Sequence, residues 1–188
     1  MNESNSLKLP TVIGDLNQFA IALDLDESYG GVWLIGKICF FIGGISVGDY
    51  ILGSSLRDVL LQMHLILSDA GTRINPRFDA MDKELLFDTV WKAIYGDEKT
   101  GLGNLAVEEC WAKHNITLPV DVFDDVRVFQ FDERDFSRLI WRSMKEDSDK
   151  GTNETRVAIG TTERVFVELS DVLTLLSRLT IGNVVSEE

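Results

Sequence analysis

The amino-acid sequence is organised around one apolar segment, Val32-Trp33-Leu34-Ile35-Gly36-Lys37-Ile38-Cys39-Phe40-Phe41-Ile42. Apolar side chains occupy both of its alternating faces, and only Lys37 requires contact with water. Because successive side chains of a strand point to opposite faces, such a segment is typical of a strand that is covered on both sides. We therefore expect residues 32–42 to form a central strand of the core, in which Trp33 is packed.

The segments on either side predict further strands. Residues 18–26 alternate apolar and polar side chains, which indicates a half-buried strand. Residues 26–31 contain two glycines and predict a turn, so residues 18–26 and 32–42 should form an antiparallel hairpin. Gly43-Gly44 predicts a second turn, which leads into a short strand at residues 45–50.

A helix is expected from Leu56 to about Asp69. Ser54 or Ser55 can cap its first turn, and Gly71 suits a left-handed conformation just beyond its end. Apolar residues recur at helical spacing and also occur on the other sides of this segment, which favours a helix in the centre of the core. They are Leu56, Val59, Leu60, Met63 and Leu67, joined by Leu61, Leu65 and Ile66.

The rest of the chain predicts more helices and strands. One helix is expected after a cap at Asp79 or Asp82, a second around residues 105–114, and a third after a cap at Ser170 or Asp171. Strands are expected at residues 126–131, 138–144, 156–159 and 164–169. Because strands and helices do not alternate regularly, the pattern indicates an α+β fold. We expect one domain at residues 12–185 after a flexible segment at 1–11, with a largely antiparallel sheet packed against a central helix and a C-terminal helix.

Composition and charge restrict the partners. The 188 residues are 45% hydrophobic, enough for one core, and 18 basic and 31 acidic residues give a net charge of −13. This charge repels phosphate backbones and anionic lipids, so it argues against nucleic-acid and membrane partners and favours a cationic one. The alternative is that acidity serves only solubility. Because the sequence has no apolar run of membrane length and no secretory signal at its start, we expect a cytoplasmic protein. We also expect a monomer or weak homodimer.

Catalytic and metal motifs are weak. Gly44-Ile45-Ser46-Val47-Gly48 matches the pattern of a hydrolase nucleophile elbow, but the predicted helix begins several residues too late. The two histidines, His64 and His114, are not at metal-ligand spacing, and a histidine on an apolar helix is more often a core residue. Cys39 and Cys110 predict neither a disulfide nor a metal site and are expected to be buried or inert. No cofactor or metal is expected.

Carboxylates give an interaction hypothesis. We expect them to form one negative rim that attracts a basic partner, although a solvated loop edge is the alternative interpretation. The candidate binding residues lie within fifteen positions: Asp121, Asp124, Asp125, Asp132, Glu133 and Asp135.

Several blocks resemble a bacterial immunity protein family, numbered 42 among those of polymorphic toxin systems. The blocks are Phe19-Ala20-Ile21, residues 31–37, Val47-Gly48-Asp49-Tyr50, residues 55–59, Asp69-Ala70-Gly71-Thr72-Arg73, residues 120–124 and Leu139-Ile140-Trp141. The resemblance implies a non-enzymatic cytoplasmic inhibitor that binds a secreted toxin, delivered by contact-dependent growth inhibition or type VI secretion, and blocks it stoichiometrically. The remaining hypotheses are an acidic adaptor or scaffold protein and a serine hydrolase that uses Ser46.

The family resemblance implies a role for the acidic residues. Toxins of such systems are often nucleases with basic clefts, and the acidic rim would then seat in such a cleft. A tight complex would also need a buried centre, for which exposed aromatic residues are candidates. These are Tyr29, Tyr50, Trp91, Trp111 and Trp141.

Overall fold

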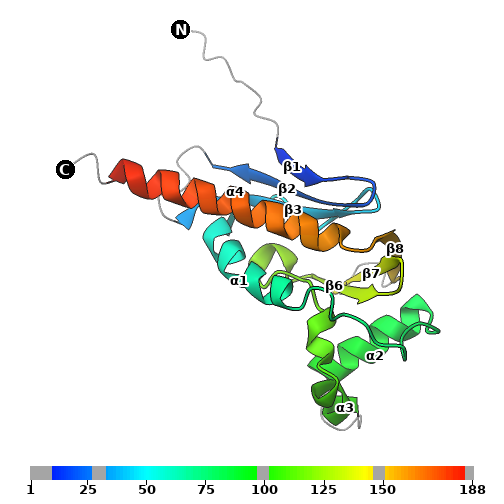
Figure 1. Ribbon diagram of the computed structural model, residues 1–188. Coiled ribbons are helices and arrows are strands. Elements are labelled where there is room, and N and C mark those ends of the chain that lie inside the picture. The colour runs from blue at the N-terminus through cyan, green and yellow to red at the C-terminus, as the bar shows by residue number, and fades with distance from the viewer. Residues whose placement is uncertain (1–9, 27–32, 97–101, 146–150, 185–188) are drawn as a thin grey trace.

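The computed structural model describes residues 10–26, 33–96, 102–145 and 151–184, and within them the chain forms two antiparallel sheets and four α-helices (Figure 1). The first sheet contains β1 (Thr11–Gly14), β2 (Phe19–Leu25), β3 (Ile35–Ile42), β4 (Ile45–Val47) and β5 (Ser54–Ser55), and the second contains β6 (Val126–Asp132), β7 (Phe136–Ser143) and β8 (Asn153–Ala158). The helices are α1 (Leu56–Ser68), α2 (Lys83–Tyr95), α3 (Leu102–Glu108) and α4 (Thr161–Val184). The predicted α+β fold with antiparallel sheets is confirmed.

The hairpin expected from the central apolar segment is present. β2 pairs antiparallel with β3 from Phe19 opposite Ile42 to Leu25 opposite Gly36. Gly43 and Gly44 both have positive φ angles, 58° and 83°, which glycine adopts without steric cost, and they turn the chain into β4. Residues 27–32, which include most of the predicted first turn, lie outside the described part of the chain.

The start of β3 differs from the prediction because of Leu34. Its φ angle is 52°, a left-handed conformation that is uncommon for a residue other than glycine. The side chain of Leu34 is fully buried, whereas Trp33 is 55% exposed. The strand consequently begins at Ile35, and the expectation that Trp33 packs in the core is wrong.

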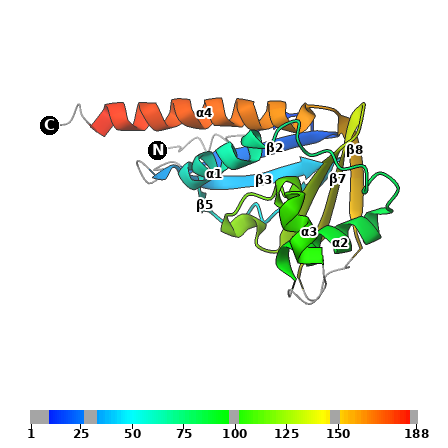
Figure 2. The same cartoon turned by 60° about the horizontal axis from the view of Figure 1, so that its bottom comes forward.

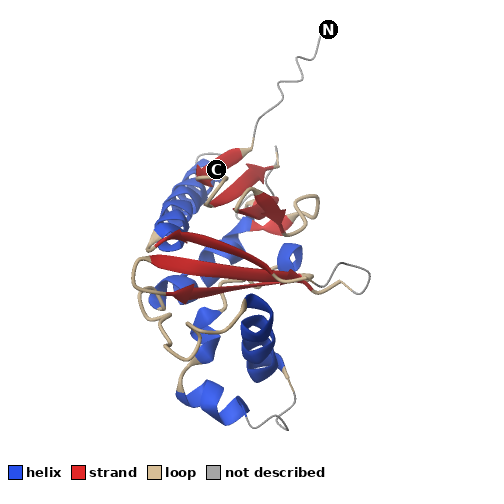
Figure 3. Ribbon diagram, turned by 90° about the vertical axis from the view of Figure 1, so that its right-hand side faces the viewer, coloured by secondary structure: helices blue, strands red, loops and turns tan. Residues whose placement is uncertain are grey.

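Strands β6 and β7 of the second sheet are covered on both faces by hydrophobic clusters. Val128 and Leu139 of β6 and β7 belong to one hydrophobic cluster, with α1, α4 and the first sheet. Phe129 and Ile140, their sequence neighbours on the opposite face, belong to a second cluster with α2 and α3. Figure 3 shows this sheet between the two groups of elements. The sheet of β6, β7 and β8 is therefore a wall shared by both cores.

In β3, by contrast, one face is covered more completely than the other. Ile38 and Phe40 are fully buried beneath α1 and α4, whereas Ile35, Lys37 and Phe41 on the opposite face are only half-buried. The predicted two-sided coverage of this strand is thus only partial. The pattern of apolar residues predicts the strand, but it does not show which neighbouring elements cover each of its faces.

Helix α1 is amphipathic rather than central. Ser55 caps it as predicted, accepting a hydrogen bond from the backbone N–H of Asp58 at 3.3 Å. Val59 and Met63 face the core, but Leu61 and Leu65 are more than half exposed. The prediction that apolar residues surround a buried helix is therefore wrong.

Helix α4 begins nine residues earlier than the earlier of its two predicted caps. Residues 164–169, expected to be a strand, lie within it. Val165, Phe166, Leu169 and Leu173 are buried at helical spacing, and the helix lies beside α1 on the first sheet (Figure 2). The same segment also alternates apolar and polar residues, so the sequence alone favoured the wrong period.

The second cluster is built by α2, α3 and a short 3₁₀ helix at Trp111–His114. Asp82 is one of the two residues predicted to cap α2. It does so by accepting hydrogen bonds from the backbone N–H groups of Glu84 and Leu85. The expected helix at residues 105–114 is divided between α3 and the 3₁₀ helix. Within the described residues, no helix combines the length and apolar composition needed to cross a bilayer.

A buried polar network connects α4 and the segment after α1 to the second sheet. Arg73, 1% exposed, donates to Glu163 of α4 at 3.0 Å and to the carbonyl of Lys113 at 2.8 Å. The side-chain amide of Gln130 donates to the same Glu163 oxygen at 2.7 Å. The ring of His114 is fully buried, and its Nδ1 lies 2.8 Å from the carbonyl oxygen of Gln130. Burial, with smaller effects of nearby Lys113 and Arg73, lowers the pKa of His114 to about 4.

Candidate functional site

The six carboxylates predicted as one rim form two groups. Asp121, Asp124 and Asp125 precede β6, and the other three lie at its far end or in the turn to β7. Because a strand rises about 3.3 Å per residue, the seven residues of β6 separate the groups by about 20 Å. The structure does not bring them together in one rim.

The far group contains one residue that cannot contact a partner. Asp132 is 4% exposed and accepts hydrogen bonds from Gln130 and from the hydroxyl of Ser137 at 2.8 and 2.7 Å. Asp132 therefore belongs to the buried polar network. Its position in the sequence, beside a polar turn, does not indicate this burial. Of its neighbours, Glu133 is half-buried and lies 3.9 Å from the Arg138 guanidinium, while Asp135 is exposed.

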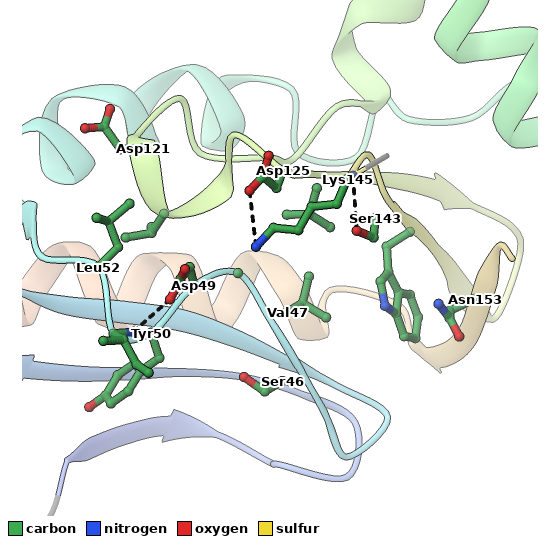
Figure 4. Close-up of a pocket in the computed structure, with 15 residues that line it drawn as sticks. Ser46, Val47, Asp49, Tyr50, Leu52, Asp121, Asp125, Ser143, Lys145 and Asn153 are labelled. Atoms are coloured by element: carbon green, nitrogen blue, oxygen red, sulfur yellow. Dashed lines mark hydrogen bonds and ion pairs between the residues drawn. The ribbon is translucent and has the colours of Figure 1, made fainter. Parts of the chain in front are cut away.

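The near group borders a groove between the two sheets (Figure 4). Asp121 and Asp125 line a hollow of about 520 Å³, together with the loop at residues 48–52. The backbone N–H of Asp49 donates to the carbonyl of Val122 at 2.8 Å, which joins this loop to the segment before β6. Asp125 forms an ion pair with Lys145 at 3.3 Å.

The loop between β4 and β5 has a defined turn geometry. Gly48 has a φ angle of 104°, and a Cβ atom there would lie 2.8 Å from the ring of Phe123. Asp49 accepts hydrogen bonds from the backbone N–H groups of Ile51 and Leu52, both at 3.1 Å. This turn presents two apolar side chains to solvent, because Ile51 is 87% and Leu52 44% exposed.

A second hollow of about 530 Å³ adjoins the first. Gly53, Asp58 and Pro119 are among its lining residues, and Asp121 lines both hollows. We refer to residues 49–53 and 119–125, which separate and border the hollows, as the saddle. It combines exposed apolar side chains with exposed carboxylates, and it is the candidate binding surface of the chain.

The predicted aromatic candidates are mostly not on the surface. Tyr50 lines the first hollow but is half-buried, as is Trp91. Trp111 and Trp141 are buried, and Tyr29 lies outside the described residues.

Trp33, which we predicted to pack in the core, is instead exposed. The guanidinium of Arg57 lies 5.7 Å from the centroid of its ring, and the hydroxyl of Ser55 donates to its carbonyl at 3.2 Å. The left-handed conformation of Leu34 that exposes Trp33 has no signal in the sequence. Ile51 and Leu52 were also missed, because an apolar pair in a short turn resembles the end of a strand.

Ser46 does not have the surroundings of a hydrolase nucleophile. It lies on β4 of a hairpin, and its hydroxyl is 3.7 Å from the Cys39 sulfur. Burial raises the pKa of the Cys39 thiol, so this neighbour stays protonated and cannot act as a base. His114 is buried in the polar network, and His64 lies on the exposed face of α1, not in the core as expected.

Neither a metal-binding cluster nor a disulfide is found in the described residues. No group of three or more histidine, cysteine, aspartate or glutamate side chains in that part of the chain is arranged to hold a metal ion. Both cysteines are free; Cys39 is buried, as expected, but Cys110 is exposed.

Comparisons with known proteins agree with this architecture. A family model described as Immunity protein 42 matches residues 11–172. The structure is similar to a crystal structure of CdiI from Burkholderia dolosa AUO158, with a TM-score of 0.68 and 19% sequence identity over 87% of this chain and 99% of the other. A search among curated proteins found no match. Because the family model spans most of the sequence, the chain belongs to the Immunity protein 42 family.

Proposed function

We propose that this protein is the immunity partner of a secreted bacterial toxin, which it neutralises by binding the toxin domain stoichiometrically and covering its active site. The match of the Immunity protein 42 model to residues 11–172 carries the proposal. The fold shared with a CdiI crystal structure supports it. Contact-dependent growth inhibition and type VI secretion are the delivery routes that the family resemblance implies.

We further propose that inhibition is non-catalytic and electrostatically assisted. Ser46 has a buried thiol, not a base, within hydrogen-bonding distance, which gives no support to hydrolysis. A net charge of −13 speeds association with a basic surface and opposes non-specific binding to phosphate backbones. A toxin with a basic cleft, such as a nuclease, fits these properties.

The test is co-expression with the toxin domain encoded immediately upstream. We expect the wild-type protein to restore growth and to co-purify with the toxin as a complex with one copy of each chain. The Ser46→Ala variant should protect equally well, whereas a hydrolase that uses this serine would lose protection.

A negative result has a defined meaning. If no toxin gene lies upstream, or if an active toxin kills cells that contain the folded protein, the immunity proposal fails. The acidic adaptor then becomes the better interpretation. Protection that disappears with Ser46→Ala in a folded variant would instead favour the hydrolase.

A further inference from the structure

We infer that the toxin docks on the saddle, with Ile51 and Leu52 at the centre of the interface and basic side chains of the toxin in the two adjoining hollows. This inference rests on the proposed function and adds the position and the chemistry of the contact. The partner surface would be apolar at its centre and carry lysine or arginine residues beside it.

Exposed apolar area is the first support. Ile51 is 87% exposed, more than any other large hydrophobic residue described, and Leu52 is exposed beside it. Isolated apolar residues are common on protein surfaces, but a pair at the tip of a structured turn between two hollows is a shape that a partner can enclose. Removal of apolar surface from water is the dominant favourable contribution to most protein–protein association.

The charge of the saddle indicates the kind of partner that would bind there. Asp49 and Asp125 line the first hollow, Asp58 lines the second, and Asp121 lines both. Of the cations nearby, Lys145 pairs with Asp125 at 3.3 Å, and Arg127 donates to the backbone carbonyls of residues 123, 124 and 126. The saddle thus presents more negative than positive charge, which complements a basic partner.

Rigidity is the third support. The hydrogen bond from Asp49 N–H to the carbonyl of Val122 joins the two halves of the saddle. The close contact between Gly48 and the ring of Phe123 holds the loop against the 3₁₀ helix at Asp121–Phe123. A surface that is ordered before binding loses less conformational entropy in the complex, so more of the contact energy appears as affinity.

A rival surface lies at the other end of the second sheet. Ile74 and Ile159 are exposed there beside a hollow of about 620 Å³, which Asp79 and Glu133 also line. Asp132 and Arg134 line the same hollow, so this surface, like the saddle, carries more negative than positive charge. This rival provides matched control variants, because it offers the same residue types at a distance from the saddle.

The experiment measures binding kinetics with the purified toxin domain encoded upstream. The saddle variants are Ile51→Ser with Leu52→Ser, and Asp121→Lys with Asp124→Lys. The controls are Ile74→Ser with Ile159→Ser, and Asp79→Lys with Asp135→Lys, which reverse two exposed carboxylates near the rival surface. We expect the apolar saddle pair to weaken binding at least about tenfold through faster dissociation. The charge pair should slow association and reduce its salt dependence, and the controls should stay within about twofold of wild type.

The outcomes separate this inference from the proposed function. If wild type binds and protects while the saddle variants bind as wild type does, the saddle is not the interface and the immunity function stands. If the control variants weaken binding instead, the rival surface is the interface. If wild type does not bind, the proposed function fails.

A second measurement does not depend on variants. Hydrogen exchange of the wild-type complex should show new protection at residues 49–53 and 119–125, and protection confined to other segments would overturn the inference.

Discussion

Acidification should destabilise this protein through one buried histidine. His114 has a pKa of about 4 in the folded protein, against 6.5 for a free side chain. At pH 7 the ring is neutral in both the folded and the unfolded state. As the pH falls below 6.5, the unfolded chain binds a proton that the folded chain does not accept until about pH 4. The free energy of unfolding therefore decreases over this interval.

The expected loss follows from proton linkage. Each pH unit in the interval costs up to about 1.4 kcal/mol, and the two pKa values give a loss of about 2 kcal/mol between pH 7 and pH 5. Two carboxylates affect stability mainly below this interval. A hydrogen bond from Thr152 lowers the pKa of Glu84, and one from Trp111 lowers that of Glu109, so their stabilising effect is lost as the pH falls through the ordinary glutamate value of 4.5 and below.

The assay is urea unfolding followed by circular dichroism at pH 7, 6, 5.5 and 5. The His114→Gln variant keeps a donor for the carbonyl of Gln130 but cannot titrate, so its stability should change little over the same range. The His64→Gln variant is the matched control, because it makes the same substitution on the exposed face of α1, outside the buried polar network. A wild-type change below about 0.5 kcal/mol, or an equal change in His114→Gln, would refute the argument.

Three further predictions concern stability, each measured by urea unfolding at pH 7. Arg73→Met should cost about 3–5 kcal/mol, because it leaves the Glu163 carboxylate without its buried partner; a loss below 1 kcal/mol would contradict this role. Gly48→Ala should cost at least about 1 kcal/mol, since the backbone is left-handed and the added methyl group meets Phe123; unchanged stability would show that the loop relaxes. Tyr50→Phe should change stability by less than about 1 kcal/mol, because its buried hydroxyl has no hydrogen-bond partner among the described residues; a larger loss would reveal a missed partner.

Local signals predicted the elements that local interactions determine. The hairpin of β2 and β3 follows from alternation and glycine turns, and the caps of α1 and α2 follow from Ser55 and Asp82 before helical stripes. The start of α4 was missed because residues 164–169 fit both a helical and a strand period. Tertiary packing against the first sheet selects the helix, and no local pattern contains that information.

The candidate site was only partly predictable. Asp121, Asp124 and Asp125 lie on or beside the saddle, but Asp132 is buried because its partners, Gln130 and Ser137, come from the strands on either side of a turn. The exposure of Ile51 likewise depends on the Asp49 turn and on contacts with a segment about seventy positions away. Such placement follows from long-range pairing, which residue types and spacing do not encode.

The shared wall of β6, β7 and β8 has a consequence for unfolding. Phe129 and Ile140 support one core while Val128 and Leu139, their neighbours along the strands, support the other. Neither core retains its packing once these strands separate, so the two halves should melt together in a single cooperative transition. A protease in the cell would accordingly meet either the intact molecule or the fully open chain, with no half-folded remnant that still carries the saddle.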